Sequence, residues 1–243
     1  MNIVGIIPAR WNSTRFPGKP LALIAGKPLV QRVWEQCAKA KELDRLIIAT
    51  DDERIADAAA DFGAEVAMTR PDHPSGSDRL AEVAQGLEAE AVLNIQGDEP
   101  LIDPDLIDRL AATLRCNSTL EMVTAATVSA DPAALDNPNV VKVVLAQNGD
   151  ALYFSRSRIP YQRDLGASPV VYRHQGIYGY RRDFLLQFVR WPQSTLEKTE
   201  QLEQLRALEN GARIRVLITE HEAQGVDSPE DVAIVERALG WSR

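Results

Sequence analysis

The sequence predicts an α/β protein with a Rossmann-like, doubly wound and mostly parallel sheet. Over residues 1–130, short apolar runs alternate with longer segments of helical periodicity, an order typical of βαβ units. After residue 130 the pattern changes to an Asn-Gly turn, a polar loop and an aromatic strand. These two observations indicate a core sheet followed by an inserted region.

Five strands and four helices alternate in the core segment. We expect strands at 3–7, 46–49, 64–68, 91–95 and 122–128, because each is a short apolar run. The helices between them are expected at 28–41, 51–62, 76–88 and 104–114. Pro28 and Pro104 stand at the beginning of the first and last helices, and Gly63 ends the second.

The rest of the chain is expected to be β-rich and helical. Asn148-Gly149 between apolar runs at 140–145 and 151–155 predicts a hairpin with a type I′ turn. A loop at 161–170, a strand at 170–180, helices at 181–190 and 196–210 and a strand at 214–219 follow. Ser228-Pro229-Glu230-Asp231 begins the last helix. We therefore divide the chain into a core (1–130), an inserted region (131–212) and a strand and helix that return to the core (213–243).

Composition excludes several classes of function. The 35 acidic residues outnumber the 27 basic ones, and the net charge of -8 argues against a nucleic-acid partner. Cys37 and Cys116 form no C-x-x-C pair, which favours reduced thiols in a cytoplasmic protein. The sequence has no leader pattern and no apolar run near the roughly 20 residues of a membrane span, so we expect no membrane partner.

Two loops carry the chemistry that points to a site. The first strand is followed by IPARWNSTRFPGKP (7–20), which places Arg10, Arg15 and Lys19 in one loop of an acidic chain. The fourth strand is followed by Asp98. Because the carboxyl ends of parallel strands meet at one sheet edge, these groups should lie together, where they suit a phosphate chain and a divalent metal. A solvated basic loop and a turn-forming Asp98 are the simpler alternatives.

Neither a G-x-G-x-x-G nor a P-loop motif is present. The dehydrogenase and P-loop classes therefore lose their main support. We expect the three cations, with Ser13 and nearby backbone N–H groups, to hold the phosphates through side chains.

Ordered motifs along nearly the whole chain identify a known family. They include IPARxxSTRxPGKPL (7–21), IIATDDE (47–53), MTRxDHxSGSDRLAEV (68–83), NIQGDEPLI (94–102), NPNVVKVV (137–144), ALYFSRSxIPY (151–161), RHxGIYGY (173–180), LExxExLEQLR (196–206) and GVDSPED (225–231). In these motifs the chain resembles the 3-deoxy-manno-octulosonate cytidylyltransferases. The resemblance implies a nucleotidyltransferase-type sheet with an inserted region for sugar binding and dimerisation.

The resemblance also implies a reaction and its residues. CTP and 3-deoxy-manno-octulosonate (Kdo) would give CMP-Kdo, a precursor of the lipopolysaccharide core, and pyrophosphate, with Mg²⁺ as cofactor, in a homodimer. The family's sites map onto a nucleotide set (Arg10, Ser13, Arg15, Lys19, Arg79), a catalytic set (Lys19, Arg10, Arg15, Asp98), a metal pair (Asp98, Asp227) and a sugar set (Gln96, Arg156, His174, Tyr178, Glu203, Gln204).

The residues of the sugar set could also have structural roles instead of contacting a sugar. On one helix spanning 196–210, Glu200, Glu203 and Gln204 would share an arc that could bind hydroxyl groups, or that is simply solvated. Arg156 suits a carboxylate, because guanidinium binds carboxylates in a bidentate fork; the alternative is a surface ion pair. His174 and Tyr178 also suit packing roles.

Related classes are less consistent with the sequence. Sialic acid cytidylyltransferases tend to have Lys-Asn where this chain has Lys19-Pro20, and sugar-1-phosphate nucleotidyltransferases have a Gly-x-Gly-Thr-Arg loop. A non-catalytic domain of this fold would lack the carboxylates or the loop cations. Ser77-Asp78 and the short loop at 161–170 depart from the family pattern. The first change is chemically mild, whereas the short loop leaves Kdo and its 8-amino variant as alternative sugars.

Overall fold

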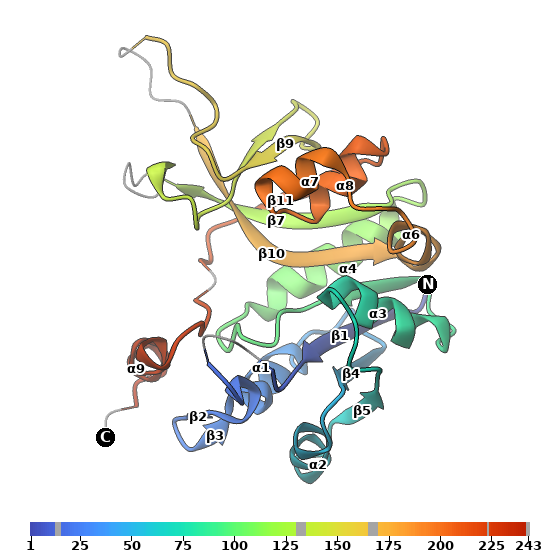
Figure 1. Ribbon diagram of the computed structural model, residues 1–243, viewed down its shortest axis with the longest axis vertical. Coiled ribbons are helices and arrows are strands. Elements are labelled where there is room, and N and C mark those ends of the chain that lie inside the picture. Colours follow the sequence, from blue (N-terminus) through green and yellow to red (C-terminus); the bar gives the residue numbers. More distant parts are fainter. Residues whose placement is uncertain (13–15, 130–134, 165–169, 223, 242–243) are drawn as a thin grey trace. The chain divides into compact units, whose positions relative to one another are not determined.

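The computed structural model of the protein describes residues 1–12, 16–129, 135–164, 170–222 and 224–241 (Figure 1). The chain forms two compact units. The first unit comprises residues 1–112 and 223–243, and the second comprises residues 113–222. This division differs from the expected one at 130 and 212, because the fifth predicted strand pairs with strands of the second unit.

The first unit contains the predicted parallel sheet. Its strands run in the order β6 (Ala91–Asn94), β1 (Ile3–Ala9), β4 (Arg45–Thr50) and β5 (Glu65–Met68), and every neighbouring pair is parallel. β1 lies between two partners and is almost entirely buried, as its unbroken apolar run predicts. The parallel α/β prediction is confirmed for this unit.

Helices connect these strands and cover the sheet. α1 (Leu29–Cys37) packs against β1 and β4, α2 (Glu53–Asp61) against β4 and β5, and α3 (Gly76–Gln85) against β1, β4 and β6. α4 (Pro104–Cys116) contains the boundary between the units, and α9 (Pro229–Ala238) completes the first unit. Ser228 and Asp231 form the capping box of α9, in agreement with the predicted start.

A small hairpin precedes α1 where the sequence predicted none. A 3₁₀ turn, η1 (Lys19–Leu21), leads to β2 (Leu23–Ile24) and β3 (Lys27–Pro28), which are joined by Ala25 and Gly26 at φ 48° and 79°. A left-handed alanine is costly. The Arg32 guanidinium binds the Ala25 carbonyl at 2.7 Å, and Glu236 of α9 accepts from the Ala25 N–H at 3.0 Å. These contacts from α1 and α9 hold the turn.

α1 is also shorter than the predicted helix at 28–41. After Cys37 the chain leaves the helix and is held by side chains from elsewhere in the first unit. Asp108 accepts hydrogen bonds from the backbone N–H groups of Lys41 and Glu42 at 2.7 and 2.8 Å. Asp44 accepts from the Ile3 N–H at 2.7 Å. Tertiary hydrogen bonds therefore override a segment of good helix propensity.

The second unit is a mixed sheet with helices. β7 (Met122–Ser129) pairs in parallel with β11 (Ile214–Thr219) and antiparallel with β10 (Val171–Arg181). β8 (Lys142–Leu145) pairs with both β10 and β9 (Ala151–Ser155). α6 (Arg182–Phe188) follows β10, and α8 (Gln204–Glu209) packs against β9 and α7 (Thr195–Glu200) (Figure 1).

The hairpin of β8 and β9 confirms the predicted strands, but the predicted type I′ turn is wrong. The Ala146 N–H donates to the Asp150 carbonyl at 2.8 Å, so three residues form the loop. Gly149 has a φ of 84°, whereas Asn148 does not have a positive φ. The Asn148 side chain instead bonds to the Asp150 N–H and carboxylate, at 3.0 and 2.9 Å. This side-chain turn stabilises the longer loop.

The single helix predicted at 196–210 is also wrong. α7 ends at Glu200, its C-cap Gln201 adopts the left-handed conformation (φ 53°, ψ 49°), and α8 begins at Gln204. A buried ion pair joins the two helices: Arg206 donates from Nε to Glu197 Oε2 at 2.8 Å and from Nη2 to Oε1 at 2.5 Å. The break lets α8 fold back so that this bidentate pair can form.

No helix among the described residues combines the length and the apolar character that crossing a membrane requires.

We expect Arg206→Met to reduce the free energy of unfolding by about 3–5 kcal/mol, because it leaves Glu197 buried without its partner. Arg45→Met is the matched control. It removes a cation from the Arg45–Glu65 pair, whose side chains are 43% and 47% exposed, and should cost at most about 1 kcal/mol. Chemical denaturation measures both values, and equal losses in the two variants would contradict the assignment.

Candidate functional site

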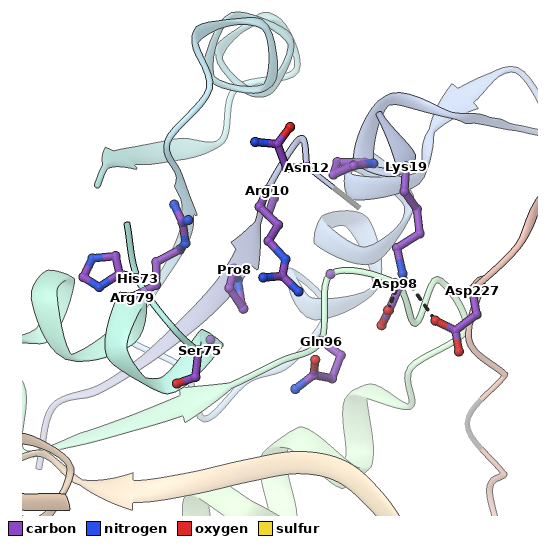
Figure 2. A pocket seen from close by; sticks show the side chains of 14 residues that line it. Pro8, Arg10, Asn12, Lys19, His73, Ser75, Arg79, Gln96, Asp98 and Asp227 are labelled. Atoms are coloured by element: carbon purple, nitrogen blue, oxygen red, sulfur yellow. Dashed lines mark hydrogen bonds and ion pairs between the residues drawn. The ribbon is translucent and has the colours of Figure 1, made fainter. Parts of the chain in front are cut away.

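A pocket of about 420 Å³ lies at the carboxyl ends of β1 and β6 in the first unit. It brings together six of the residues predicted from sequence (Arg10, Lys19, Arg79, Gln96, Asp98 and Asp227) (Figure 2). The prediction that the two chemically unusual loops share one sheet edge is therefore confirmed. Ser13 and Arg15 lie outside the described residues.

Gly97 sets how closely these two loops approach. A Cβ atom at this position would lie 2.6 Å from the Pro8 carbonyl oxygen, a distance that real side chains do not adopt. The Ile95 N–H also donates to the Ile6 carbonyl at 3.0 Å, so the chain after β6 stays against β1. A residue without a side chain is required here, and it delivers Asp98 to the end of β1.

Lys19 lies between the two predicted metal carboxylates. Its Nζ is 2.6 Å from Asp98 Oδ2 and 3.6 Å from Asp227 Oδ1 (Figure 2). The Val226 N–H donates to the Asp98 carbonyl at 2.9 Å, which fixes the segment before α9 beside the Asp98 loop. Three segments distant in sequence thus place two acids around one cation.

The loop that carries Arg10 closes on itself at Trp11 and Gly18. The Gly18 N–H donates to the Trp11 carbonyl at 3.1 Å, and Gly18 has a φ of 71°. The guanidinium carbon of Arg54 lies 3.3 Å from the centroid of a Trp11 ring, a cation–π contact with the first turn of α2. Arg10 is exposed at the pocket, so its charge is available to a ligand.

Ser75, the N-cap of α3, places the beginning of that helix at the pocket. The hydroxyl of Ser75 accepts from the Asp78 N–H at 3.2 Å. Arg79, in contrast, is only 4% exposed and is paired with Asp51 at 3.0 Å and with the Thr69 hydroxyl. Arg79 therefore lines the pocket while its guanidinium binds protein groups.

Sequence reasoning assigned no role to His73, which also lines the pocket. Its Nε2 contacts Glu82. Burial alone would raise the pKa of Glu82, but the hydrogen bonds from His73 and from the Arg70 N–H lower it below its ordinary value. His73 precedes the N-cap Ser75 by two residues, and this spacing is the signal that could have placed it at the helix start.

In the second unit, Arg156 holds the backbone together. Its Nε donates to the Glu200 carbonyl at 2.7 Å, Nη1 to the Pro138 carbonyl at 2.9 Å and Nη2 to the Gln201 carbonyl at 3.3 Å. The guanidinium of Arg156 is therefore neither part of a surface ion pair nor free of protein partners. Its predicted contact with a sugar carboxylate stays a prediction.

The predicted arc of Glu200, Glu203 and Gln204 on one helix is wrong, because the chain breaks at Gln201. Burial would raise the pKa of Glu200, but hydrogen bonds from Ser155, the Arg156 N–H and Tyr153 lower it. Glu200 therefore anchors β9. Gln204 is 3% exposed, and its Nε2 has no hydrogen-bond partner among the described residues.

His174 and Tyr178 lie together on β10, with ring centroids 5.4 Å apart. Burial lowers the pKa of His174 to about 3, so its imidazole is neutral at physiological pH. Burial, assisted by the charge of Glu203, raises the pKa of the Tyr178 hydroxyl. Both side chains are uncharged groups that can form directional hydrogen bonds.

Comparisons with known proteins show the family to which the chain belongs. The sequence profile described as "Cytidylyltransferase" matches residues 4–214. A 3-deoxy-manno-octulosonate cytidylyltransferase of Syntrophotalea carbinolica is 51% identical over 98% of this chain and 99% of its own length. The chain belongs to the 3-deoxy-manno-octulosonate cytidylyltransferase family. Another 3-deoxy-manno-octulosonate cytidylyltransferase, from Solibacter usitatus, is 54% identical over 97% of this chain and 93% of its own length.

Solved structures confirm the fold of this cytidylyltransferase. A structure described as CMP:2-keto-3-deoxy-manno-octonic acid synthetase complexed with CTP is 40% identical, with a TM-score of 0.95 and 99% of both chains covered. The 4-diphosphocytidyl-2C-methyl-D-erythritol synthase of Anaerococcus prevotii is 16% identical with a TM-score of 0.65, over 98% of this chain and 96% of its own. The second likeness concerns the fold alone.

We expect Gly97→Ala to lower the free energy of unfolding by about 1–3 kcal/mol, the usual cost of forcing an extra carbon into a packed site. Gly76→Ala is the matched control at the same pocket. The nearest atom to its Cβ would be Pro8 Cγ at 3.9 Å, so stability should be unchanged or raised by up to about 1 kcal/mol. Denaturation curves test both variants; a neutral Gly97→Ala would contradict the steric argument.

Proposed function

We propose that this cytidylyltransferase transfers a cytidylyl group from CTP to Kdo and releases pyrophosphate, supplying activated Kdo for the lipopolysaccharide core. The observation that carries the proposal is the pocket in which Arg10 and Lys19 face Asp98 and Asp227 at the carboxyl edge of a parallel sheet. Such edges are the usual ligand sites of open α/β sheets. The names of the relatives, and the CTP in the related structure, support this choice of substrates.

In the proposed reaction, the anomeric hydroxyl of Kdo attacks the α-phosphorus of CTP in line. A bond forms between the sugar oxygen and phosphorus, the bond from phosphorus to the bridging oxygen of the β-phosphate breaks, and the hydroxyl loses its proton as pyrophosphate leaves. We assign Arg10, Lys19, Ser13 and Arg15 to the phosphates. Their contribution is to position CTP and to offset the charge that accumulates on the leaving group.

The site suits Mg²⁺ as a proposed cofactor. Asp98 and Asp227 already converge on one cation, the ammonium group of Lys19, and carboxylate oxygens are the ligands that Mg²⁺ prefers. In the described ranges no group of three or more His, Cys, Asp or Glu side chains could hold a metal, so phosphate oxygens and water would complete the coordination. When bound, Mg²⁺ would neutralise phosphate charge and lower the pKa of a coordinated hydroxyl.

For contact with the sugar, we assign Gln96, Arg156, His174, Tyr178, Glu203 and Gln204. Support comes from the unpaired amide of buried Gln204, a donor that lacks a protein acceptor in the described part of the chain. Arg79 is assigned to the cytidine side as a group that shapes the pocket. Its pairing with Asp51 favours this indirect role over direct contact.

We also propose that the protein is a cytoplasmic homodimer. Exposed apolar side chains of the second unit, namely Val128 (54%), Leu152 (62%) and Tyr161 (86%), support a partner surface there. Light scattering at several protein concentrations would measure the mass directly, and a monomer at all concentrations would refute the dimer.

The test of the proposed function is pyrophosphate release from CTP. Kdo, 8-amino-Kdo, sialic acid and sugar-1-phosphates are supplied separately as acceptors, each with Mg²⁺. We expect release with Kdo or its 8-amino variant and none with sugar-1-phosphates. No release with either Kdo compound would refute the proposed function.

We predict that Asp98→Asn lowers kcat by at least ~100-fold, the order expected when a key electrostatic group of an active site is lost. Asp105→Asn, an exposed acid in the first turn of α4, is the control and should leave kcat near the wild-type value. Steady-state kinetics at saturating Mg²⁺ measure kcat for both variants and for the wild type. Wild-type turnover in Asp98→Asn would remove this residue from the site.

Lys19→Met should increase the affinity for Mn²⁺, used as a probe for Mg²⁺, by at least ~10-fold in the absence of nucleotide. The ammonium group lies between the two carboxylates, and like charges a few Å apart repel by several kcal/mol near a protein surface. Electron paramagnetic resonance counts free Mn²⁺ without any assay of turnover. The gain should vanish in Asp98→Asn/Lys19→Met, and unchanged Mn²⁺ affinity in Lys19→Met would contradict the prediction.

A further inference from the structure

A fully buried hydroxyl contacts the imidazole of His174. Thr124 of β7 is 0% exposed and lies opposite an irregularity in β10, where the register shifts between Gln175 and Tyr178. Its Oγ1 lies 2.7 Å from the Ile177 carbonyl oxygen and 3.3 Å from that of Gln175. The same Oγ1 lies 2.9 Å from His174 Nε2. One oxygen atom thus serves three polar neighbours.

The number of protons on these groups decides the tautomer of His174. A threonine hydroxyl has one proton to donate and lone pairs that accept, whereas a carbonyl oxygen can only accept. The shortest contact, at 2.7 Å to Ile177, is between two oxygens and requires the Thr124 proton. A lone pair of Oγ1 therefore faces His174, and the 2.9 Å contact is a hydrogen bond only if Nε2 carries the ring proton.

The surroundings keep the ring in this orientation and uncharged. Phe154 meets it edge-on with centroids 5.0 Å apart, and the ring of Tyr178 lies at a centroid distance of 5.4 Å. Burial alone lowers the pKa of His174, with no charged partner contributing. Because Nε2 carries the proton of a neutral imidazole, Nδ1 must be an acceptor. Within the described part of the chain, Nδ1 has no hydrogen-bond partner.

We propose that Thr124 is a positioning residue for sugar binding: it holds His174 as the Nε2–H tautomer, so that Nδ1 accepts a hydrogen bond from a hydroxyl group of the acceptor sugar. The proposed hydrogen bond between Nδ1 and the sugar rests on the proposed function, in which His174 belongs to the Kdo site. The tautomer is a property of the protein alone, so it is tested separately.

Nitrogen-15 NMR of the uniformly labelled full-length protein tests the tautomer. The chain has 3 histidines, and His174→Gln identifies the signals of His174 by their loss. We expect a protonated Nε2 and an unprotonated Nδ1 that do not change across neutral pH. An Nδ1–H tautomer or an imidazolium in the wild-type protein would overturn the proposal, whatever the variants do.

Three variants test the role of the hydroxyl. Thr124→Val removes it at nearly constant shape and should convert His174 wholly or partly to the other tautomer. Thr124→Ser restores the hydroxyl and should restore Nε2–H. Thr127→Val is the matched control: Thr127 is also a buried threonine of β7, but its Oγ1 has no hydrogen-bond partner among the described residues, so its loss should not affect His174. If Thr124→Val keeps the wild-type tautomer, Thr124 does not fix it.

Kinetics of the same variants test the sugar part. The KM for Kdo should rise about tenfold in Thr124→Val, the loss expected for one misdirected hydrogen bond, while the KM for CTP stays within about twofold. Thr124→Ser and Thr127→Val should resemble the wild type. A changed tautomer with an unchanged KM for Kdo would refute the positioning role and leave the proposed function intact. A wild-type protein that does not use Kdo would instead refute the proposed function, while the NMR result stands.

Discussion

The close approach of two parallel strand ends is the constraint on which the site depends. β1 and β6 are hydrogen-bonded neighbours, and the chain beyond β6 can stay against β1 only because Gly97 has no side chain. This contact brings an acidic loop to a cationic one with no dedicated binding motif. The pocket therefore depends on the pairing of β1 with β6 and on the absence of a side chain at Gly97.

Several charges of the site in the first unit are paired with an opposite charge. Lys19 neutralises Asp98 and approaches Asp227, while Arg79, which lines the pocket, is paired with Asp51. Among the described cations that line the pocket, Arg10 is the exposed one. An anion that binds to the exposed Arg10 must therefore compete with carboxylates for Lys19. Such competition favours a ligand that brings its own counter-cation over a simple phosphate.

Local signals predicted the parallel strands, the first residues of most helices and the meeting of Arg10, Lys19 and Asp98. They failed wherever a distant side chain decides the backbone conformation. The break at Gln201 is set by a buried pair nine residues apart in sequence, Glu197 and Arg206, which the sequence presents as ordinary helix charges. The donors of Arg156 likewise bind carbonyl groups, whose positions no residue pattern encodes.

The irregularity of β10 also limits how this segment can change in length. Between His174 and Tyr178 the chain advances four residues, while its partner β7 advances two, from Ala126 to Thr124. Two extra residues preserve the alternation of faces, since side chains alternate with period two. Removing one residue here would turn Tyr178 and the rest of the strand to the opposite face of the sheet. Removing two residues would remove the irregularity and leave each side chain on its present face. Insertions and deletions at this point should therefore accumulate in pairs.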